Sequence, residues 1–313
     1  MDIKNEPHEI ENFEDEIDLV QIFKVLFEGK WIIFSVTTVA SILAVIYSLS
    51  LPNIYESKIL LVPNEANSRP SLLQNYSSLA NIAGVSLPSE NNEGNSFKAI
   101  RKLNSLSFFE SNILPNIFLP DLMAFDSWNS GKNINNYKND IYDLSSNSWV
   151  RDYSYPQKQI PSAQESFDKF QAEHVSISEE KKNNFVTIKV KHQSPYVAKE
   201  WAELLTNQIN YFYREKDREE AEKAVNYLNT QIAKTNLSEI KQVIAALLQQ
   251  ETQKLTLIEA NEFYVYEFID PPAVMETKSE PSRAIICILG AILGGILSIL
   301  TVMLRHYVFV SKD

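Results

Sequence analysis

The sequence predicts an α+β membrane protein in which two transmembrane helices flank an α/β base domain with a long helical hairpin. Two runs of 21 residues carry no charged side chain, and one lies near each end of the 313-residue chain. Between these runs, several segments alternate apolar and polar residues as strands do. A longer segment then repeats its apolar residues with a helical period. These three observations define the fold class.

The two uncharged runs have the length of membrane spans. They cover residues 31–51 and 284–304, and 21 residues make a helix of roughly 31 Å, which matches the hydrocarbon core of a bilayer. A buried core helix of this length would show a polar stripe, and neither run has one. The first run follows an acidic leader, "ENFEDEID", so we expect a retained anchor rather than a cleaved signal peptide. Residues 1–30 and 305–313 then lie on one side of the bilayer, and residues 52–283 on the other.

Four segments of the region between the spans are predicted to be strands. They lie at about residues 53–63, 173–180, 185–192 and 262–270. The second and third alternate apolar and polar residues and are joined by the polar link "KKNN", which predicts a hairpin. The fourth is apolar on both faces, as a covered central strand would be.

The strongest helical pattern predicts a hairpin of two long helices, which we call the stalk (about residues 195–260). Ser194 is a candidate N-cap, with Pro195 at the first helical position. The apolar stripe includes Trp201, Phe212, Leu228 and Ile232. A capping box of Asn236 and Glu239 is expected to start the second helix. The acidic stretch "REKDREEAEK" in the first helix fits a solvated face better than a binding site.

The remaining segments between the spans give weaker signals. Residues 71–84 and 96–110 are expected to be helices, and Ser162 with Glu165 forms a candidate capping box before another helix. Residues 115–160 are rich in Asn, Ser, Tyr and Trp without a clear period. We expect this stretch to be an irregular loop.

No motif for catalysis or for metal or cofactor binding is found. The four histidines are far apart in the sequence, and there is no H-x-x-x-H, C-x-x-C, phosphate-loop or G-x-S-x-G pattern. Cys287 is the single cysteine, so no intrachain disulfide forms. The net charge of −11 argues against a nucleic-acid partner. We therefore expect no enzyme activity, no catalytic residue, no cofactor and no metal.

The second span contains a G-x-x-x-G pattern, which permits close helix packing in membranes. The first span offers alanines at the same spacing. A packed contact would use Ala40, Ala44, Gly290, Gly294 and Gly295. The alternative is that these are ordinary small residues, since glycine is common in membrane helices.

A short proline-containing segment joins the last strand to the second span. Its sequence is "DPPAVMETKSEPSRA", with Pro271, Pro272 and Pro281. Because proline fixes φ, we expect a rigid joint at this position.

The order of these features resembles the bacterial chain-length determinant family, the Wzz-type polysaccharide co-polymerases without a kinase domain. The most specific pieces are the leader, first span and strand, "DEIDLVQIFKVLFEGKWII" with "LPNIYESKILLVP", and the segment "FIDPPAVMETKSEPSRA" with the last span. The middle of the chain matches the family in the order of its elements rather than in its individual residues. The family's proline segment usually has more prolines. Here Met275 and Lys278 occupy the intervening positions, three residues apart, between Pro272 and Pro281.

The resemblance implies an inner-membrane protein with a cytoplasmic leader and tail and a periplasmic domain of residues 52–283. It implies a ring-like homo-oligomer that sets the length of a surface polysaccharide, typically the O antigen of lipopolysaccharide. Such a protein acts on a separate membrane polymerase and on the growing lipid-linked polysaccharide, without catalysis. The joint would hold the last strand and the last span at a fixed angle.

Two other functions share this layout. One is the membrane-adaptor half of a split tyrosine-kinase system for exopolysaccharide or capsule, with its kinase on another chain. The other is a periplasmic ligand sensor. A kinase or an output domain would have to follow the second span, and only "RHYVFVSKD" follows it here.

Overall fold

A computed structural model describes residues 19–64, 95–180, 182–306 and 308 of the chain. The chain divides into two units. The helix-pair unit comprises Met1–Pro52 and Pro281–Asp313, and the sheet domain comprises Asn53–Glu280. The expected helix at residues 71–84 lies outside the described residues.

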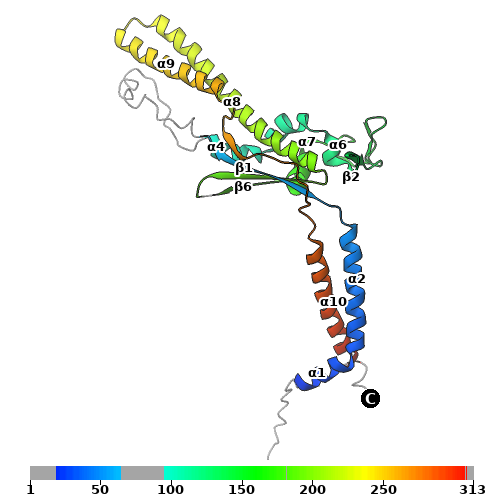
Figure 1. Cartoon of the computed structure of the whole chain (residues 1–313). Helices are drawn as coiled ribbons and strands as arrows, with labels where there is room; N and C mark the ends of the chain where they lie inside the picture. The colour runs from blue at the N-terminus through cyan, green and yellow to red at the C-terminus, as the bar shows by residue number, and fades with distance from the viewer. Residues whose placement is uncertain (1–18, 65–94, 181, 307, 309–313) are drawn as a thin grey trace, which may run out of the picture. The chain divides into compact units, whose positions relative to one another are not determined.

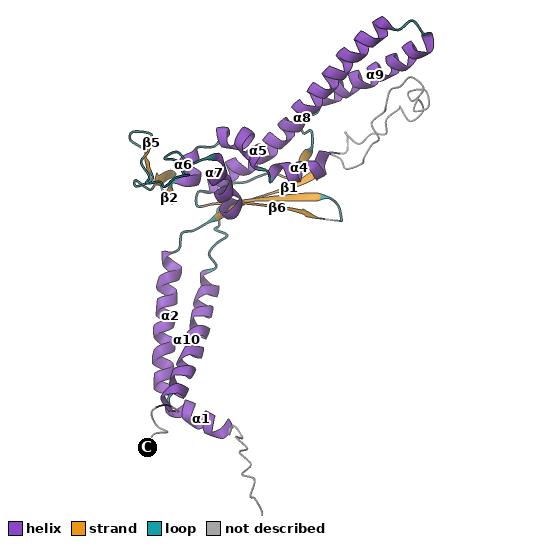
Figure 2. Ribbon diagram, turned by 180° about the vertical axis from the view of Figure 1, so that it is seen from behind, coloured by secondary structure: helices purple, strands orange, loops and turns teal. Residues whose placement is uncertain are grey.

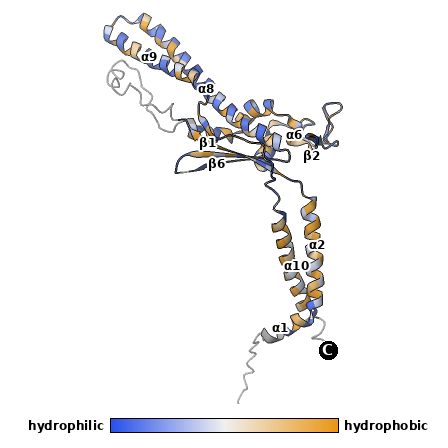
Figure 3. Cartoon of the chain, in the orientation of Figure 1, coloured by the Kyte–Doolittle hydropathy of each residue, from blue (hydrophilic) through white to orange (hydrophobic). Residues whose placement is uncertain are grey.

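The helix-pair unit contains three helices in its described residues, α1 (Leu19–Glu28), α2 (Lys30–Ser50) and α10 (Arg283–Arg305). By length and composition, α2 and α10 are each able to cross a membrane, and both are mainly hydrophobic (Figure 3). They pack side by side (Figure 1). α1 lies within the acidic leader, where no helix was predicted, and the apolar residues of "LVQIFKVLF" were the signal for it.

The sheet domain is built on a four-stranded sheet in the order β6-β7-β1-β8, and all neighbours are antiparallel. The strands are β1 (Tyr55–Pro63), β6 (Val175–Glu180), β7 (Phe185–His192) and β8 (Tyr266–Asp270). The predicted hairpin is β6–β7, and Asn184 has a φ of 56° in its turn, a conformation that asparagine tolerates. This mixed α/β domain between two membrane-type helices confirms the predicted fold class.

The prediction of a central strand at residues 262–270 was wrong. β8 begins only at Tyr266 and, among the described strands, pairs with β1 alone, so it lies at the edge of the described sheet. Tyr264 and Val265 are buried, but they lie before the strand and pack into the core from there. The continuous apolar run therefore reflects this core contact rather than burial on both faces of a strand.

Helices cover one face of the sheet and bury its apolar side chains (Figure 2). Val186, Ile188 and Val190 alternate with half-buried residues along β7. Ile59 and Leu61 of β1 join them beneath the first part of α8 (Pro195–Lys234). One apolar face and one polar face are typical of an antiparallel sheet.

Residues 115–160 are not an irregular loop, and that prediction was wrong. They contain the helix α6 (Leu119–Met123) and two small hairpins, β2 (Phe125–Asn129) with β3 (Ile134–Tyr137) and β4 (Tyr142–Asp143) with β5 (Ser148–Trp149). Rings of Phe118, Tyr137, Tyr142 and Trp149 contact one another at centroid distances of 5.2–6.1 Å. Such aromatic packing gives no sequence period, so the pattern of the sequence did not reveal these elements.

The helix expected at residues 96–110 is interrupted. α4 (Asn95–Leu103) ends before Ser105, whose side chain accepts a hydrogen bond from the Phe108 amide and starts α5 (Leu106–Phe108). A π-helical turn (Phe109–Ile113) and a 3-10 turn (Leu114–Asn116) follow. A serine that caps a new helix breaks the old one despite the continuous apolar spacing.

The predicted helix starts are realised in three ways. Ser162 caps α7 (Ala163–Lys169) by accepting from the Glu165 amide, while the Glu165 carboxylate pairs with Arg151 instead of closing the box. α7 continues into a π-helical turn (Phe170–His174).

Ser194 occupies the N-cap position of α8 without a side-chain cap. The prediction of a capping box formed by Asn236 and Glu239 was wrong. α9 (Ser238–Ala260) begins after Leu237, which has no side chain that can cap the helix.

Candidate functional site: helix pair, joint and stalk

The helix pair, α2 with α10, is packed through the small residues that the sequence singled out. A Cβ added to Gly294 would lie 2.5 Å from the Cβ of Ala40, and one added to Gly290 would overlap Ala44. Any larger side chain at these glycines would push the two helices apart. The small-residue face is therefore used within one chain, by its own first span.

Gly295 does not take part in this contact. An added Cβ there would meet no atom within 4 Å. Beside it, the Ser298 hydroxyl donates to the Gly295 carbonyl and lies 3.5 Å from the Thr37 hydroxyl of α2. This polar contact and the glycine–alanine contacts together align α2 with α10.

The turn between α1 and α2 is also fixed against α10. A Cβ on Gly29 would lie 2.5 Å from Cγ1 of Val302, so only glycine fits this approach. Val25 of α1 is buried, whereas Phe23 and Phe27 are exposed. α1 is thus an ordered part of the helix-pair unit.

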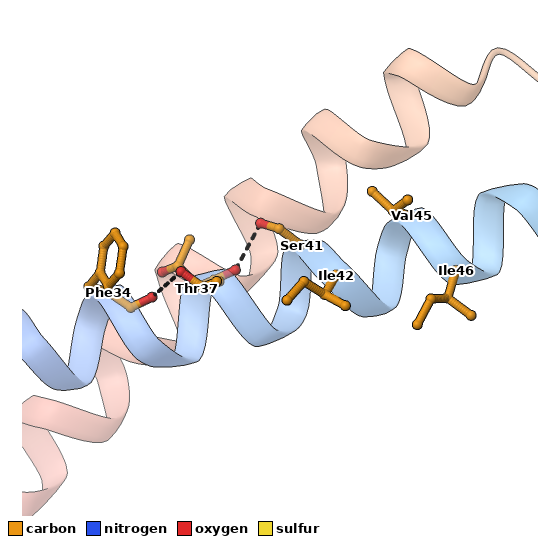
Figure 4. A pocket seen from close by; sticks show the side chains of 7 residues that line it. Phe34, Thr37, Ser41, Ile42, Val45 and Ile46 are labelled. Carbon is orange, nitrogen blue, oxygen red and sulfur yellow. Dashed lines mark hydrogen bonds between the residues drawn. The ribbon is translucent and has the colours of Figure 1, made fainter.

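A groove of about 410 Å³ runs along α2 between Phe34 and Ile46 (Figure 4). The Ser41 hydroxyl donates to the Thr37 carbonyl, as a dashed line in Figure 4 shows. The Thr38 hydroxyl donates to the Phe34 carbonyl. The hydroxyls of Thr38 and Ser41 are thus bonded within the helix, the Thr37 hydroxyl contacts Ser298 of α10, and the rest of the lining is apolar. The groove is suited to hydrocarbon rather than to a polar ligand.

The joint, residues 270–281, runs beside the start of β1. β8 ends at Asp270, where Pro271 and Pro272 have no amide hydrogen for continuing the ladder. The Ser57 hydroxyl donates to the Ala273 carbonyl, and the backbones of Ile54 and Glu280 form an antiparallel bridge. The segments that enter and leave the sheet domain are thereby fastened to each other. Pro281 directly precedes Ser282, the N-cap of α10.

The stalk residues fall into two groups. Trp201 is fully buried in the core of the sheet domain, and Phe212 packs edge-on against Phe108 at 5.9 Å. These two side chains therefore anchor the first half of α8 to the sheet domain. Leu228 and Ile232 are half-buried in the part of α8 that runs alongside α9 beyond the sheet (Figure 1).

The structure brings together two histidines that sequence reasoning treated as scattered. The rings of His174 and His192 lie 5.5 Å apart, and each lies 5.2 Å from Trp201. Burial lowers the pKa of both, and for His192 burial and the neighbouring His174 lower the pKa to about 3. The predicted β6–β7 hairpin was the available signal, because it puts the two histidine segments on neighbouring strands. The register, Val175 opposite Val190, is seen only in the structure and puts His174 next to Lys191.

Sequence reasoning also missed a buried amide at the base of the stalk. The side chain of Asn210 accepts from the amides of Val265 and Tyr266 and donates to the Tyr266 carbonyl. It therefore binds α8 to the edge strand β8 through three hydrogen bonds. A polar residue within the apolar stripe of the helix was the signal.

Within the residues that the structure describes, no group of three His, Cys, Asp or Glu side chains is arranged to hold a metal. The predicted site residues thus belong to three features of the molecule: the helix pair, the joint and the stalk. Their geometry serves packing and orientation.

A comparison with protein families agrees with the resemblance read from the sequence. Residues 15–110 match the Wzz family model, described as chain length determinant protein. This segment contains α1, α2 and β1, and it is under a third of the chain. The match confirms the predicted resemblance over these residues and supports a role in regulating polysaccharide chain length.

A search of solved structures finds similarity to a full-length bacterial polysaccharide co-polymerase. The alignment covers 94% of this chain and 98% of the other, with 14% identity and a TM-score of 0.40. A likeness with this TM-score carries no argument about the fold or the function of this chain. No curated protein matches the sequence.

Proposed function

We propose that the whole chain is a polysaccharide co-polymerase that regulates the chain length of a bacterial surface polysaccharide without catalysing its synthesis. The observation that carries this proposal is the family match at residues 15–110. The described part of this segment contains α1, α2, β1, α4 and α5. Within it, β1 pairs with β7 and β8. The O antigen of lipopolysaccharide is the polymer that we propose.

In this proposal the protein resides in the bacterial inner membrane, with the sheet domain in the periplasm and the leader and tail in the cytoplasm. Support comes from the two helices that are long and apolar enough to span a bilayer. Alkaline phosphatase fused after Lys191 should be active, and phosphatase fused at the C-terminus should be inactive. The reverse activities would exclude this orientation.

We further propose a ring-like homo-oligomer that acts on a separate membrane polymerase and on the growing lipid-linked polysaccharide. The small-residue contact within each chain supports a rigid helix pair as the membrane part of each subunit. Replacing Gly290 and Gly294 by Ile should separate α2 from α10 and weaken oligomers in mild detergent. Gly295→Ile is the matched control, since an added Cβ there meets no neighbour. Equal cross-linked ladders from both variants would contradict a role for the packed contact in assembly.

The deciding experiment is a gel ladder of surface polysaccharide from the host with and without this gene. Deletion should leave polymer of uncontrolled length, and the intact gene supplied in trans should restore a narrow length distribution. Complete loss of polymer on deletion would indicate a synthetic enzyme instead. Unchanged lengths, with loss of tyrosine phosphorylation of a separate kinase, would favour the adaptor of a split kinase system.

A further inference from the structure

A second cavity lies in the sheet domain, beside the histidine pair His174 and His192. It has a volume of about 380 Å³ and lies at the end of β7, between α6, β2 and the π-helical turn after α7. Three lysines line it, Lys138, Lys169 and Lys191, with a single carboxylate, Glu173. The lining therefore has more positive than negative side chains, although the net charge of the whole chain is −11.

The three lysines differ in how strongly they are already paired. Lys191 is bonded to Glu280 at 2.5 Å and lies 3.9 Å from Glu56. Lys169 lies 4.0 Å from Glu173, with Lys169 half-buried and Glu173 exposed, and a long pair of this kind near the surface contributes little free energy. Among the described residues, Lys138 has no ion pair. An incoming anion can therefore bind Lys138 and Lys169 without breaking a strong internal contact.

Of the two histidines that line the cavity, His174 keeps one ring nitrogen for a ligand, whereas both nitrogens of His192 are already hydrogen-bonded. His192 donates from Nε2 to the Asp121 carbonyl and accepts at Nδ1 from the Ser194 amide, so both of its nitrogens are used. His174 donates from Nδ1 to the Lys191 carbonyl at 2.7 Å. Its Nε2 remains, 4.0 Å from Glu173, and in the neutral ring this atom accepts a hydrogen bond from a hydroxyl.

The rest of the lining is apolar except for Gln193, an uncharged polar residue. Ile54, Leu122 and Phe125 line the cavity, and the Phe125 ring lies 4.3 Å from the His192 ring. Small-molecule sites commonly combine such a wall with a few charged or polar groups that fix the orientation of the ligand. The cavity matches a metal ion poorly, because only one carboxylate and one free imidazole nitrogen line it.

We propose that this cavity, lined by Lys138, Lys169, Lys191 and His174 opposite Ile54, Leu122 and Phe125, binds one negatively charged monosaccharide unit. The anionic group is held by Lys138 and Lys169, a hydroxyl donates to Nε2 of His174, and the C–H face of the ring packs on the apolar wall. A carboxylate and a phosphate are both suitable anions for lysine. Sugar is the ligand class because this inference rests on the proposed function, which places the chain beside a polysaccharide.

The test is a binding titration of the full-length protein in neutral detergent, by calorimetry or saturation-transfer NMR. The probes are glucuronate, glucose 6-phosphate, glucose and inorganic phosphate. We expect at least one charged sugar to bind about tenfold more tightly than glucose, since a charge-assisted hydrogen bond is worth about a factor of ten or more. Which charged sugar binds better tells whether the site recognises a carboxylate or a phosphate.

The variant Lys138→Gln should weaken the charged sugars about tenfold and leave glucose unchanged. Its side chain is exposed, so the fold is expected to persist. Lys223→Gln is the matched control, because Lys223 is exposed on the stalk and pairs only with Glu219 among the described residues. The inference is overturned if glucose binds as tightly as the charged sugars. It is also overturned if Lys138→Gln binds like the wild type, or if inorganic phosphate binds as tightly as glucose 6-phosphate.

The outcome separates this inference from the proposed function. If the purified protein binds no charged sugar while the gene still controls polymer length in cells, only the cavity inference fails. If the sugar binds but deletion leaves polymer length unchanged, the proposed function fails and the cavity inference stands.

Discussion

The two halves of α8 belong to one continuous helix but are stabilised in different ways. The half from Pro195 to Tyr213 contains almost all of the buried residues of the helix, packed against β1 and β7. In the half from Arg214 to Lys234, only Ala221 is buried, and α9 is the main neighbour. A continuous helical period in the sequence therefore does not imply a uniform core contact.

The difference follows from what each half can bury. The first half covers a sheet face and gains the full free energy of apolar burial. The second half gains only a two-helix contact, supported by surface ion pairs such as Lys216–Glu220 and Lys223–Glu219. We expect the second half to open locally while the first half remains folded.

The largest effect is expected from a cavity in the first half. Trp201→Ala should lower the free energy of unfolding of the sheet domain by about 4 kcal/mol, because it removes a fully buried ring from the core. Tyr227→Ala in the second half is the matched control: its side chain is 64% exposed, and the change should stay within about 0.5 kcal/mol. Denaturant titration in detergent measures both. Equal losses would contradict the distinction between the halves.

A proline in the second half should act strongly but locally. Leu228→Pro removes one helix hydrogen bond and clashes with the preceding turn, at a cost of about 3 kcal/mol or more. Amide exchange should increase between Arg214 and Ala260 and stay slow between Val197 and Tyr213. Leu228→Ala separates the loss of the side chain from the break of the backbone. Faster exchange throughout α8 would mean that the two halves unfold together.

Acid should affect the first half through His192, which packs against Trp201. The pKa of His192 is lowered from 6.5 to about 3 in the folded protein, so between these values the unfolded chain binds a proton that the folded chain excludes. Stability then falls as the pH decreases, by about 2 kcal/mol from pH 6 to pH 4.5. The lowered pKa of His174 acts in the same direction.

The measurement for this acid effect is a series of denaturant titrations across that pH range. His192→Gln, which cannot be protonated, should give a flatter dependence on pH than the wild type. An equal slope in the variant would show that carboxylates alone cause the acid sensitivity.

The smallest effect is expected from the surface charges of the second half. Glu219→Ala should cost about 0.3 kcal/mol by removing an i,i+4 pair with Lys223. Added salt should reduce the difference from the wild type. Amide exchange in the second half is sensitive to so small a change, and a loss above 1 kcal/mol would indicate a specific acidic site in "REKDREEAEK".

Features set by neighbours in the sequence were predictable from the sequence itself. The uncharged runs at residues 31–51 and 284–304 correspond to α2 and α10, and the periodic segment corresponds to α8 and α9. Helix bonds join residues four apart and hydropathy is a property of each residue, so both can be read locally. The spacing of Gly290 and Gly294 identified a packing face for the same reason.

Features set by contacts between distant segments were decided only by the tertiary structure. Strand order made β8 an edge strand, and the register of β6 with β7 brought His174 to His192. Asn210 gained its role only when α8 met the segment before β8. Residues 115–160 acquired their short elements through aromatic packing that has no sequence period. The physical reason is that sheet pairing and core contacts join residues far apart in the chain, and single-residue patterns carry no information on which segments meet.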